Sequence, residues 1–223
     1  MTRTKSRRSD GPAPARLLLA GATGVVGRAV LALALADARV AQVVAVTRRP
    51  LPPHPRLDNV VGDPAVLAGD AECWRVDAVI CTLGTTIAKA GSRAAFAAVD
   101  RDLVLRVARL ARTAGAGAFA LNSSVGADPR SGSFYLRTKG EAEAGLRDLG
   151  YPSVTLVRPS LIDAERAENR PGERAGLLVA RVFRPLIPAR YRAVSPEAIG
   201  RALLEGVLAA APGVTAIESE DLA

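Results

Sequence analysis

Apolar positions along the chain follow two alternating patterns. Short continuous apolar runs are typical of buried parallel strands, and most of them are followed by a segment with apolar residues at helical spacing. The runs predict strands at 17–20, 42–47, 58–63, 76–81, 118–122 and 154–157, and the helical pattern covers 24–37, 92–100, 101–113, 134–149 and 198–210. Strands that alternate with helices predict an α/β fold, a doubly wound parallel sheet of the Rossmann type.

The two ends of the chain depart from this alternation. Residues 1–14 are polar and basic without apolar periodicity, so we expect a disordered tail before a single domain over 15–223. Beyond Arg158 the stretch 163–174 is charged, and 176–183 has the pattern of a short apolar helix. We expect a small substrate-side extension here, with 163–190 as a mobile cover over the site. Ser195 and Pro196 form a helix start, and 214–217 is predicted to be an edge strand.

The first strand runs into a glycine-rich turn that opens the first helix. Gly21 permits the tight turn, Gly24 lets backbone N–H groups approach a pyrophosphate, and Gly27 lets the helix lie close on the sheet. The helix N-terminus adds unpaired N–H donors and the positive end of its dipole. A glycine triplet also occurs in ordinary strand–turn–helix units. The strand before it and the helix after it favour a dinucleotide site.

The end of the second strand bears on which dinucleotide would bind. Sites that prefer NAD carry an acidic residue about 20 positions after the glycines, which holds the ribose hydroxyls. This chain has Thr47, Arg48 and Arg49 there. Guanidinium groups match a 2′-phosphate, so we expect NADPH to be preferred over NADH. Asp63, at the end of the third strand, either contacts the adenine or caps a short helix that opens at Pro64.

The net charge of +8 raises the possibility of a nucleic-acid partner. Apart from the tail, the arginines are scattered, and four of them decorate the polar face of one predicted helix. Those four are Arg101, Arg106, Arg109 and Arg112. Neither an aromatic platform nor a recognition motif accompanies them. Nucleic-acid binding is therefore disfavoured.

Cysteine and histidine usage argues against a metal site. Cys73 and Cys81 do not have zinc-ligand spacing, and two scattered cysteines suit a reducing compartment. His54 is the only histidine and lies in a proline-rich loop. No apolar run reaches the length that spans a membrane, and the apolar stretch after Arg7 and Arg8 contains the glycine turn, which argues against an export signal. We expect a cytosolic protein without metal or membrane contact.

A tyrosine and a lysine share one face of the helix at 134–149. Tyr135 and Lys139 are four residues apart, and Ser123 and Ser124 precede them at the end of the fifth strand. These residues could equally be a half-exposed tyrosine, a solvated lysine and two loop serines. Their position favours chemistry, because they converge on the edge of the sheet that carries the glycine turn.

With these residues the chain resembles the short-chain dehydrogenase/reductase superfamily, in its atypical or extended-like branch. The resemblance rests on GATGVVG at 21–27, NSSVGAD at 122–128 and YLRTKGE at 135–141. The block CTLGTTIAKAGS at 81–92 narrows it to the group similar to the Tat-interacting protein. The similarity extends over most of 16–210.

The resemblance implies roles for the matching residues. Tyr135 would be the acid/base, Lys139 would stabilise its phenolate and bond the nicotinamide ribose, and Ser124, or Ser123, would hold the substrate oxygen. Extended relatives often carry an asparagine where this chain has Asp100. The resemblance therefore does not carry over a proton relay that depends on that asparagine. The expected cofactor contacts are Gly21, Thr23, Gly24, Val25, Val26, Gly27, Thr47, Arg48, Arg49, Asp63, Leu83, Gly84, Thr85, Tyr135, Lys139 and Pro159.

Together these features predict an NADPH-dependent oxidoreductase that acts on a small carbonyl or alcohol. An NADP-bound epimerase or dehydratase of nucleotide sugars is a second possibility, although the chain after Arg158 is short for a nucleotide-sugar pocket. A third is a non-catalytic protein whose partner affinity depends on bound NADPH. We expect a small-molecule substrate and a monomer or homodimer.

Overall fold

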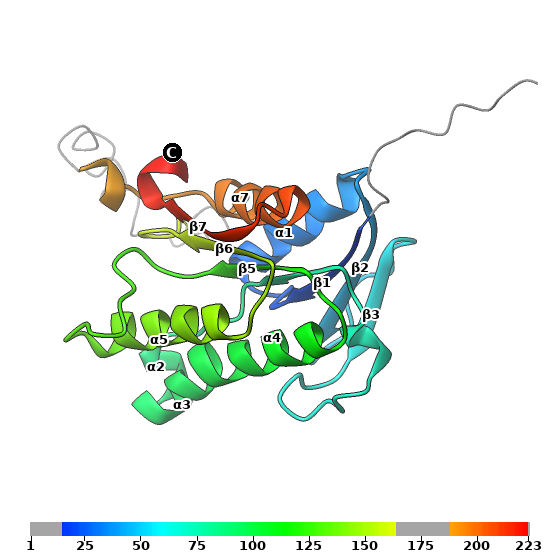
Figure 1. Cartoon of the computed structure of the whole chain (residues 1–223), viewed down its shortest axis with the longest axis horizontal. Coiled ribbons are helices and arrows are strands. Elements are labelled where there is room, and N and C mark those ends of the chain that lie inside the picture. Colours follow the sequence, from blue (N-terminus) through cyan, green and yellow to red (C-terminus); the bar gives the residue numbers. More distant parts are fainter. Residues whose placement is uncertain (1–14, 164–187, 223) are drawn as a thin grey trace, which may run out of the picture.

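A sheet of seven parallel strands forms the centre of the structure, a computed structural model that describes residues 15–163 and 188–222 (Figure 1). Its order is β3-β2-β1-β4-β5-β6-β7, and every neighbouring pair is parallel. The strands are β1 Ala15–Ala20, β2 Val40–Thr47, β3 Leu57–Val61, β4 Ala78–Cys81, β5 Ala118–Asn122, β6 Ser153–Arg158 and β7 Gly213–Glu218. Because the order reverses beside β1, a crevice for a ligand is expected between the carboxyl ends of β1 and β4. The predicted fold class is confirmed.

Helices cover both faces of this sheet. The helices α1 (Val25–Ala36) and α7 (Pro196–Ala209) pack together on one face, while α3, α4 and α5 lie on the other (Figure 1). Successive β1 side chains enter opposite cores. Leu17 and Leu19 pack in the core under α1 and α7, and Leu18 packs in the core under α4 and α5. The remaining helices are α2 Ile87–Ala90, α3 Arg93–Ala97, α4 Val104–Thr113 and α5 Phe134–Asp148, with short 3₁₀ turns at Glu72–Trp74, Ala189–Tyr191 and Ser219–Leu222.

The two helices predicted at 92–100 and 101–113 form one continuous helical run. It begins at α3, where the Ser92 hydroxyl accepts a hydrogen bond from the Ala95 N–H. It then passes through a π-helical turn at Ala98–Leu103 into α4. A π turn inserts an extra residue into the helix and is often found at functional sites. Here the turn carries Asp100, which is buried.

The other expectations for helices and strands have mixed outcomes. The helix expected at Pro64 is wrong, because the chain makes only one turn there, in which the N–H groups of Val66 and Leu67 donate to the Asp63 carbonyl. The helix start at Ser195 and the edge strand at 214–217 are confirmed, the latter as β7. The tail at 1–14, the helix at 176–183 and most of the cover at 163–190 lie outside the described residues.

Candidate cofactor and active site

The three glycines of the turn between β1 and α1 differ in how much room a side chain would have. A Cβ would clash at Gly21 and Gly27, and it would meet one atom at Gly24. Gly21 has φ +92°, and a Cβ there would lie 2.7 Å from the Thr82 carbonyl carbon. A Cβ on Gly27 would overlap the Gly21 carbonyl oxygen, so any side chain there would push α1 off the sheet. Gly24 is exposed, and the nearest atom to its Cβ position is the Gly21 oxygen at 3.3 Å.

The start of α1 is suited to a phosphate. Gly24 is its N-cap residue, so no side chain caps the helix, and its first turn carries no acidic residue. The first N–H groups of a helix have no partner within the helix, and an anion is the ligand that they and the dipole favour. Thr23, beside Gly24, is exposed, and Val25 is half-buried. The turn therefore fits the pyrophosphate of a dinucleotide.

The loop after β4 lies directly against this turn. The Thr82 hydroxyl is 3.1 Å from the carbonyl oxygens of both Ala20 and Gly21. Further along, the Thr85 N–H donates to Asp100 Oδ2 over 2.8 Å. A Cβ on Gly84, between them, would lie 3.4 Å from Asp100 Oδ1. The loop thus connects the glycine turn to the buried carboxylate of the π turn.

Lys139 forms a buried ion pair with that carboxylate. Its Nζ is 2.7 Å from Asp100 Oδ1, and the two side chains are 6% and 1% exposed. Tyr135 lies one helical turn earlier on α5, half-buried, with its ring 5.6 Å from that of Phe96. Sequence reasoning placed Tyr135 and Lys139 on one face of a helix, but it missed the ion pair. The signal for it in the sequence was Asp100, at a position where the resemblance to extended relatives implies an asparagine.

The two adjacent serines differ in their surroundings. Ser123 Oγ donates to Glu143 Oε1 over 2.6 Å, and Arg158 donates to both oxygens of the same carboxylate. Arg158 also binds Glu218, and hydrogen bonds to both carboxylates raise the pKa of its guanidinium. Ser124 Oγ, by contrast, is 3.4 Å from the Val125 carbonyl oxygen, a long contact. Both serines are buried.

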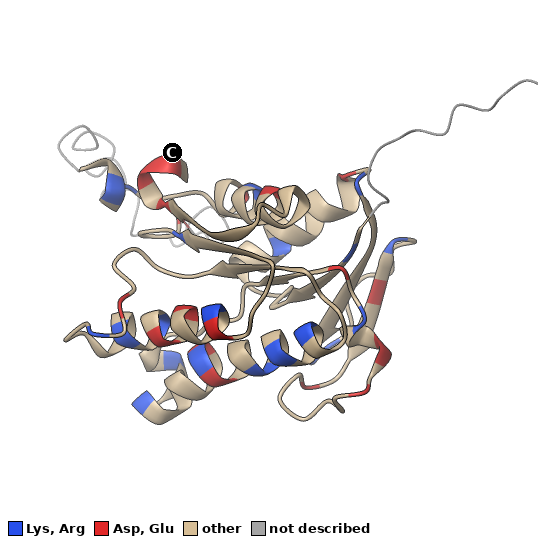
Figure 2. Ribbon diagram, in the orientation of Figure 1, with Lys and Arg blue, Asp and Glu red and all other residues tan. Residues whose placement is uncertain are grey.

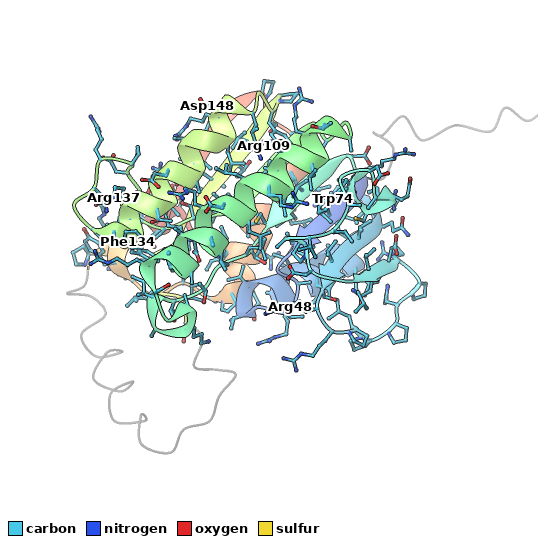
Figure 3. All side chains as sticks on the ribbon, turned by 90° about the horizontal axis from the view of Figure 1, so that it is seen from below. Arg48, Trp74, Arg109, Phe134, Arg137 and Asp148 are labelled. Atoms are coloured by element: carbon cyan, nitrogen blue, oxygen red, sulfur yellow. The ribbon has the colours of Figure 1, made fainter. Side chains whose placement is uncertain are left out.

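The residues expected to bind the adenosine part of the cofactor lie at the same edge of the sheet, at the end of β2. Thr47 is buried, donating its hydroxyl proton to the Arg49 carbonyl and accepting from Asn59. Arg48 and Arg49 are exposed, and Figure 3 shows Arg48 at the margin of the molecule. In the part of the chain that the structure describes, neither guanidinium has an ion-pair partner. Both are therefore available to an anion.

Two further residues from the expected set serve the loops themselves. Asp63 Oδ1 accepts from the Ala65 N–H at 2.9 Å in the single turn that replaces the expected helix, so the helix-capping role is not confirmed, and contact with the adenine stays a prediction. The Pro159 carbonyl accepts from the Val125 N–H at 2.9 Å and so holds the loop after β5 against the end of β6.

Cys81, at the end of β4, is an inert neighbour of the site. It is fully buried, and burial raises the pKa of its thiol to about 12, so the thiol stays protonated near neutral pH. Within 15–163 and 188–222, no group of three histidine, cysteine or carboxylate side chains is arranged to hold a metal ion.

The arginines of α4 are used largely within the fold. Arg106 donates to the carbonyl oxygens of Pro64 and Leu67, and Arg112 donates to that of Gly150. Arg101, in the π turn, pairs with Glu141 of α5 at 2.7 Å. Figure 2 shows these basic residues spread along α4, with acidic residues among the basic ones on α5.

Comparison with known proteins identifies the family. A family model described as NAD(P)H-binding matches residues 21–178. The chain belongs to this NAD(P)H-binding family. Protein HTATIP2 of Rattus norvegicus is 34% identical over 205 residues, which cover 88% of this chain and 83% of the relative. Protein fmp52, mitochondrial, of Emericella nidulans is 36% identical over 177 residues, covering 76% of this chain and 74% of the relative.

These matches confirm the resemblance to the atypical short-chain dehydrogenases and to the group that is similar to the Tat-interacting protein. Solved structures agree on the fold. MoeE5 in complex with UDP-glucose and NAD has a TM-score of 0.67 at 20% identity, covering 93% of this chain and 79% of that chain. A short chain dehydrogenase family protein from Francisella tularensis has a TM-score of 0.62 at 15% identity, covering 94% and 99%. At these identities the likeness shows the fold alone.

The comparisons correct the expected location. Several Fmp52 relatives are mitochondrial by name, which contradicts the cytosolic prediction. That prediction weighed cysteine usage, export signals and membrane spans. The segment 1–14 is rich in arginine and serine with a single acidic residue, Asp10, and such a composition is shared by disordered tails and mitochondrial transit segments. None of the described helices is long and apolar enough to cross a membrane.

Proposed function

We propose that this protein is an NADPH-dependent oxidoreductase that reduces a small carbonyl compound or oxidises the corresponding alcohol. One observation carries the proposal. The buried Lys139 ammonium lies at the end of a continuous line of contacts that starts at the open glycine turn and runs through the loop after β4. The phosphate-binding turn and the catalytic helix therefore belong to one site.

Each residue of the site has a role in this reaction. Tyr135 gives its hydroxyl proton to the carbonyl oxygen, and Lys139 bonds the nicotinamide ribose through its N–H groups. Ser124 binds the substrate oxygen, because the hydroxyl of Ser123 is already committed to Glu143. The cofactor, when bound, supplies the hydride.

The preference for NADPH rests on the loop after β2. Arg48 and Arg49 are exposed there and carry no ion pair to a described carboxylate. A guanidinium binds a 2′-phosphate through two parallel hydrogen bonds. It cannot accept hydrogen bonds from ribose hydroxyls, which is what the carboxylate of an NAD site does.

The test is Tyr135→Phe, assayed by NADPH oxidation against a panel of aldehydes, ketones and nucleotide sugars. Loss of the proton donor should lower turnover by about a hundredfold or more, with NADPH affinity nearly unchanged. Tyr151→Phe is the matched control, because its hydroxyl binds the Ala108 carbonyl in the core and not the site. Full activity of Tyr135→Phe on a confirmed substrate would refute the catalytic role. NADPH binding without any Tyr135-dependent oxidation would instead identify a cofactor sensor.

A further inference from the structure

The ion pair between Asp100 and Lys139 makes the expected nicotinamide end of the site electrically neutral. A lysine in this position normally brings a positive charge. Here a carboxylate lies 2.7 Å from the ammonium, and both side chains are almost fully buried. Opposite charges this close, away from water, compensate each other's field.

The surrounding structure holds the carboxylate in place. Oδ2 accepts from the Thr85 N–H, Oδ1 faces Lys139, and the backbone at Gly84 passes over the pair. The π turn that inserts an extra residue before α4 carries Asp100 to this position. The two side chains meet as an ion pair of 2.7 Å, so the carboxylate fixes the place of the Lys139 ammonium. Asp100 therefore orients Lys139 as well as neutralising it.

We propose that Asp100 is a positioning residue which balances the charge of Lys139 and thereby favours the oxidised cofactor, NADP⁺, over the reduced form. The inference rests on the proposed function, which puts the nicotinamide ribose at Lys139. The oxidised nicotinamide ring carries a positive charge, and the reduced ring does not. An uncompensated ammonium would repel only the oxidised ring. With Asp100 present that repulsion is removed, and NADPH in the site becomes a stronger hydride donor.

The test measures binding rather than turnover. Dissociation constants for NADP⁺ and NADPH are determined by calorimetry for the native protein and for Asp100→Asn. The two forms share the adenine, both riboses and all phosphates, so their affinity ratio isolates the effect of charge at the ring. Asparagine keeps one oxygen as acceptor for the Thr85 N–H, and it replaces the oxygen that faces Lys139 with a neutral NH₂ group, so both the negative charge and the ion pair are lost. The ratio should shift toward NADPH by about tenfold.

Asp77→Asn is the matched control. It removes the same charge at the start of β4, where Asp77 accepts from the Arg16 N–H, at the opposite end of that strand. Its ratio should stay within about twofold of the native value, and thermal unfolding shows whether each variant is folded. An unchanged ratio in a folded Asp100→Asn that binds both forms would overturn the inference and leave the proposed function intact.

The native protein provides a second test that does not depend on any variant. It should bind NADP⁺ at least as tightly as NADPH. A native preference for NADPH over NADP⁺ of about tenfold or more would also overturn the role of Asp100. Binding of neither form would refute the proposed function itself, and the inference with it.

Discussion

The neighbouring residues Ser123 and Ser124 show how much the fold decides at the scale of single side chains. Both are buried and both lie in the loop directly after β5. Ser123 donates to a carboxylate that Arg158 also binds, whereas the Ser124 hydroxyl makes one long contact, to the Val125 carbonyl, with the residues that the structure describes. A substrate oxygen can therefore replace the weak partner of Ser124, but it would have to break a buried network to reach Ser123.

This difference predicts opposite effects of two alanine substitutions. Ser124→Ala should lower kcat by about a hundredfold, as for the loss of one donor to a reacting oxygen, and should barely change stability. Ser123→Ala should lower the free energy of unfolding by about 1–3 kcal/mol, because a buried carboxylate loses a donor. Chemical denaturation measures the free energy of unfolding of both variants, and steady-state kinetics on the same substrate measures their kcat. A stable but inactive Ser123→Ala, beside an active Ser124→Ala, would reverse the assignment.

Sequence alone could not make these distinctions. The partners of Ser123 come from α5 and β6, and the partner of Lys139 comes from the π turn before α4. Such contacts depend on how elements pack, which periodicity does not encode. The pair Tyr135 and Lys139 was predictable because a spacing of four residues fixes a shared helix face.

At the scale of elements, different glycines of the turn between β1 and α1 serve the binding of cofactor and the packing of the helix. Gly27 is closed in by the Gly21 carbonyl, while a Cβ on Gly24 would meet one atom, the Gly21 oxygen at 3.3 Å, and Gly24 has an ordinary φ of −70°. The two glycines therefore have different reasons to lack a side chain. One serves the contact between helix and sheet, and the other serves the ligand.

Alanine at each position should separate the two roles. Gly24→Ala should leave the free energy of unfolding within about 0.5 kcal/mol of the native value and weaken NADPH binding, since its methyl group occupies the path of the pyrophosphate. Gly27→Ala should cost about 1–3 kcal/mol through overpacking and weaken binding through the displaced helix. Thermal unfolding and NADPH titration test both. A Gly24→Ala variant that is unstable but binds normally would contradict this division.

Two elements differ from the sequence prediction, each for its own local reason. The break expected between 100 and 101 is a π turn, because an inserted residue shifts the apolar phase without ending the helix. The helix expected at Pro64 is a single turn after Asp63, and the chain then continues to the 3₁₀ turn at Glu72–Trp74 and to β4. The strongly periodic segment α4 was predicted correctly, since its buried residues Val104, Val107, Ala108 and Ala111 form one apolar face.

At the scale of the whole molecule, the order of the strands brings the candidate residues to one edge. Parallel strands place all their carboxyl ends together, so the loops after β1, β2, β4 and β5 meet although they are far apart in sequence. Alternating strands and helices were enough to predict this convergence. Cellular location was not predictable in the same way, because the spacing of strands and helices carries no information about it.

The most direct test of the account is a titration of the native protein with NADPH and NADH. We expect tighter binding of NADPH, and we expect Arg48→Ala to weaken NADPH by about ten- to a hundredfold while NADH is nearly unchanged. Arg109→Ala is the matched control, because Arg109 is also exposed and lies on α4, apart from Arg48 (Figure 3). Tighter binding of NADH than of NADPH by the native protein would contradict the central claim.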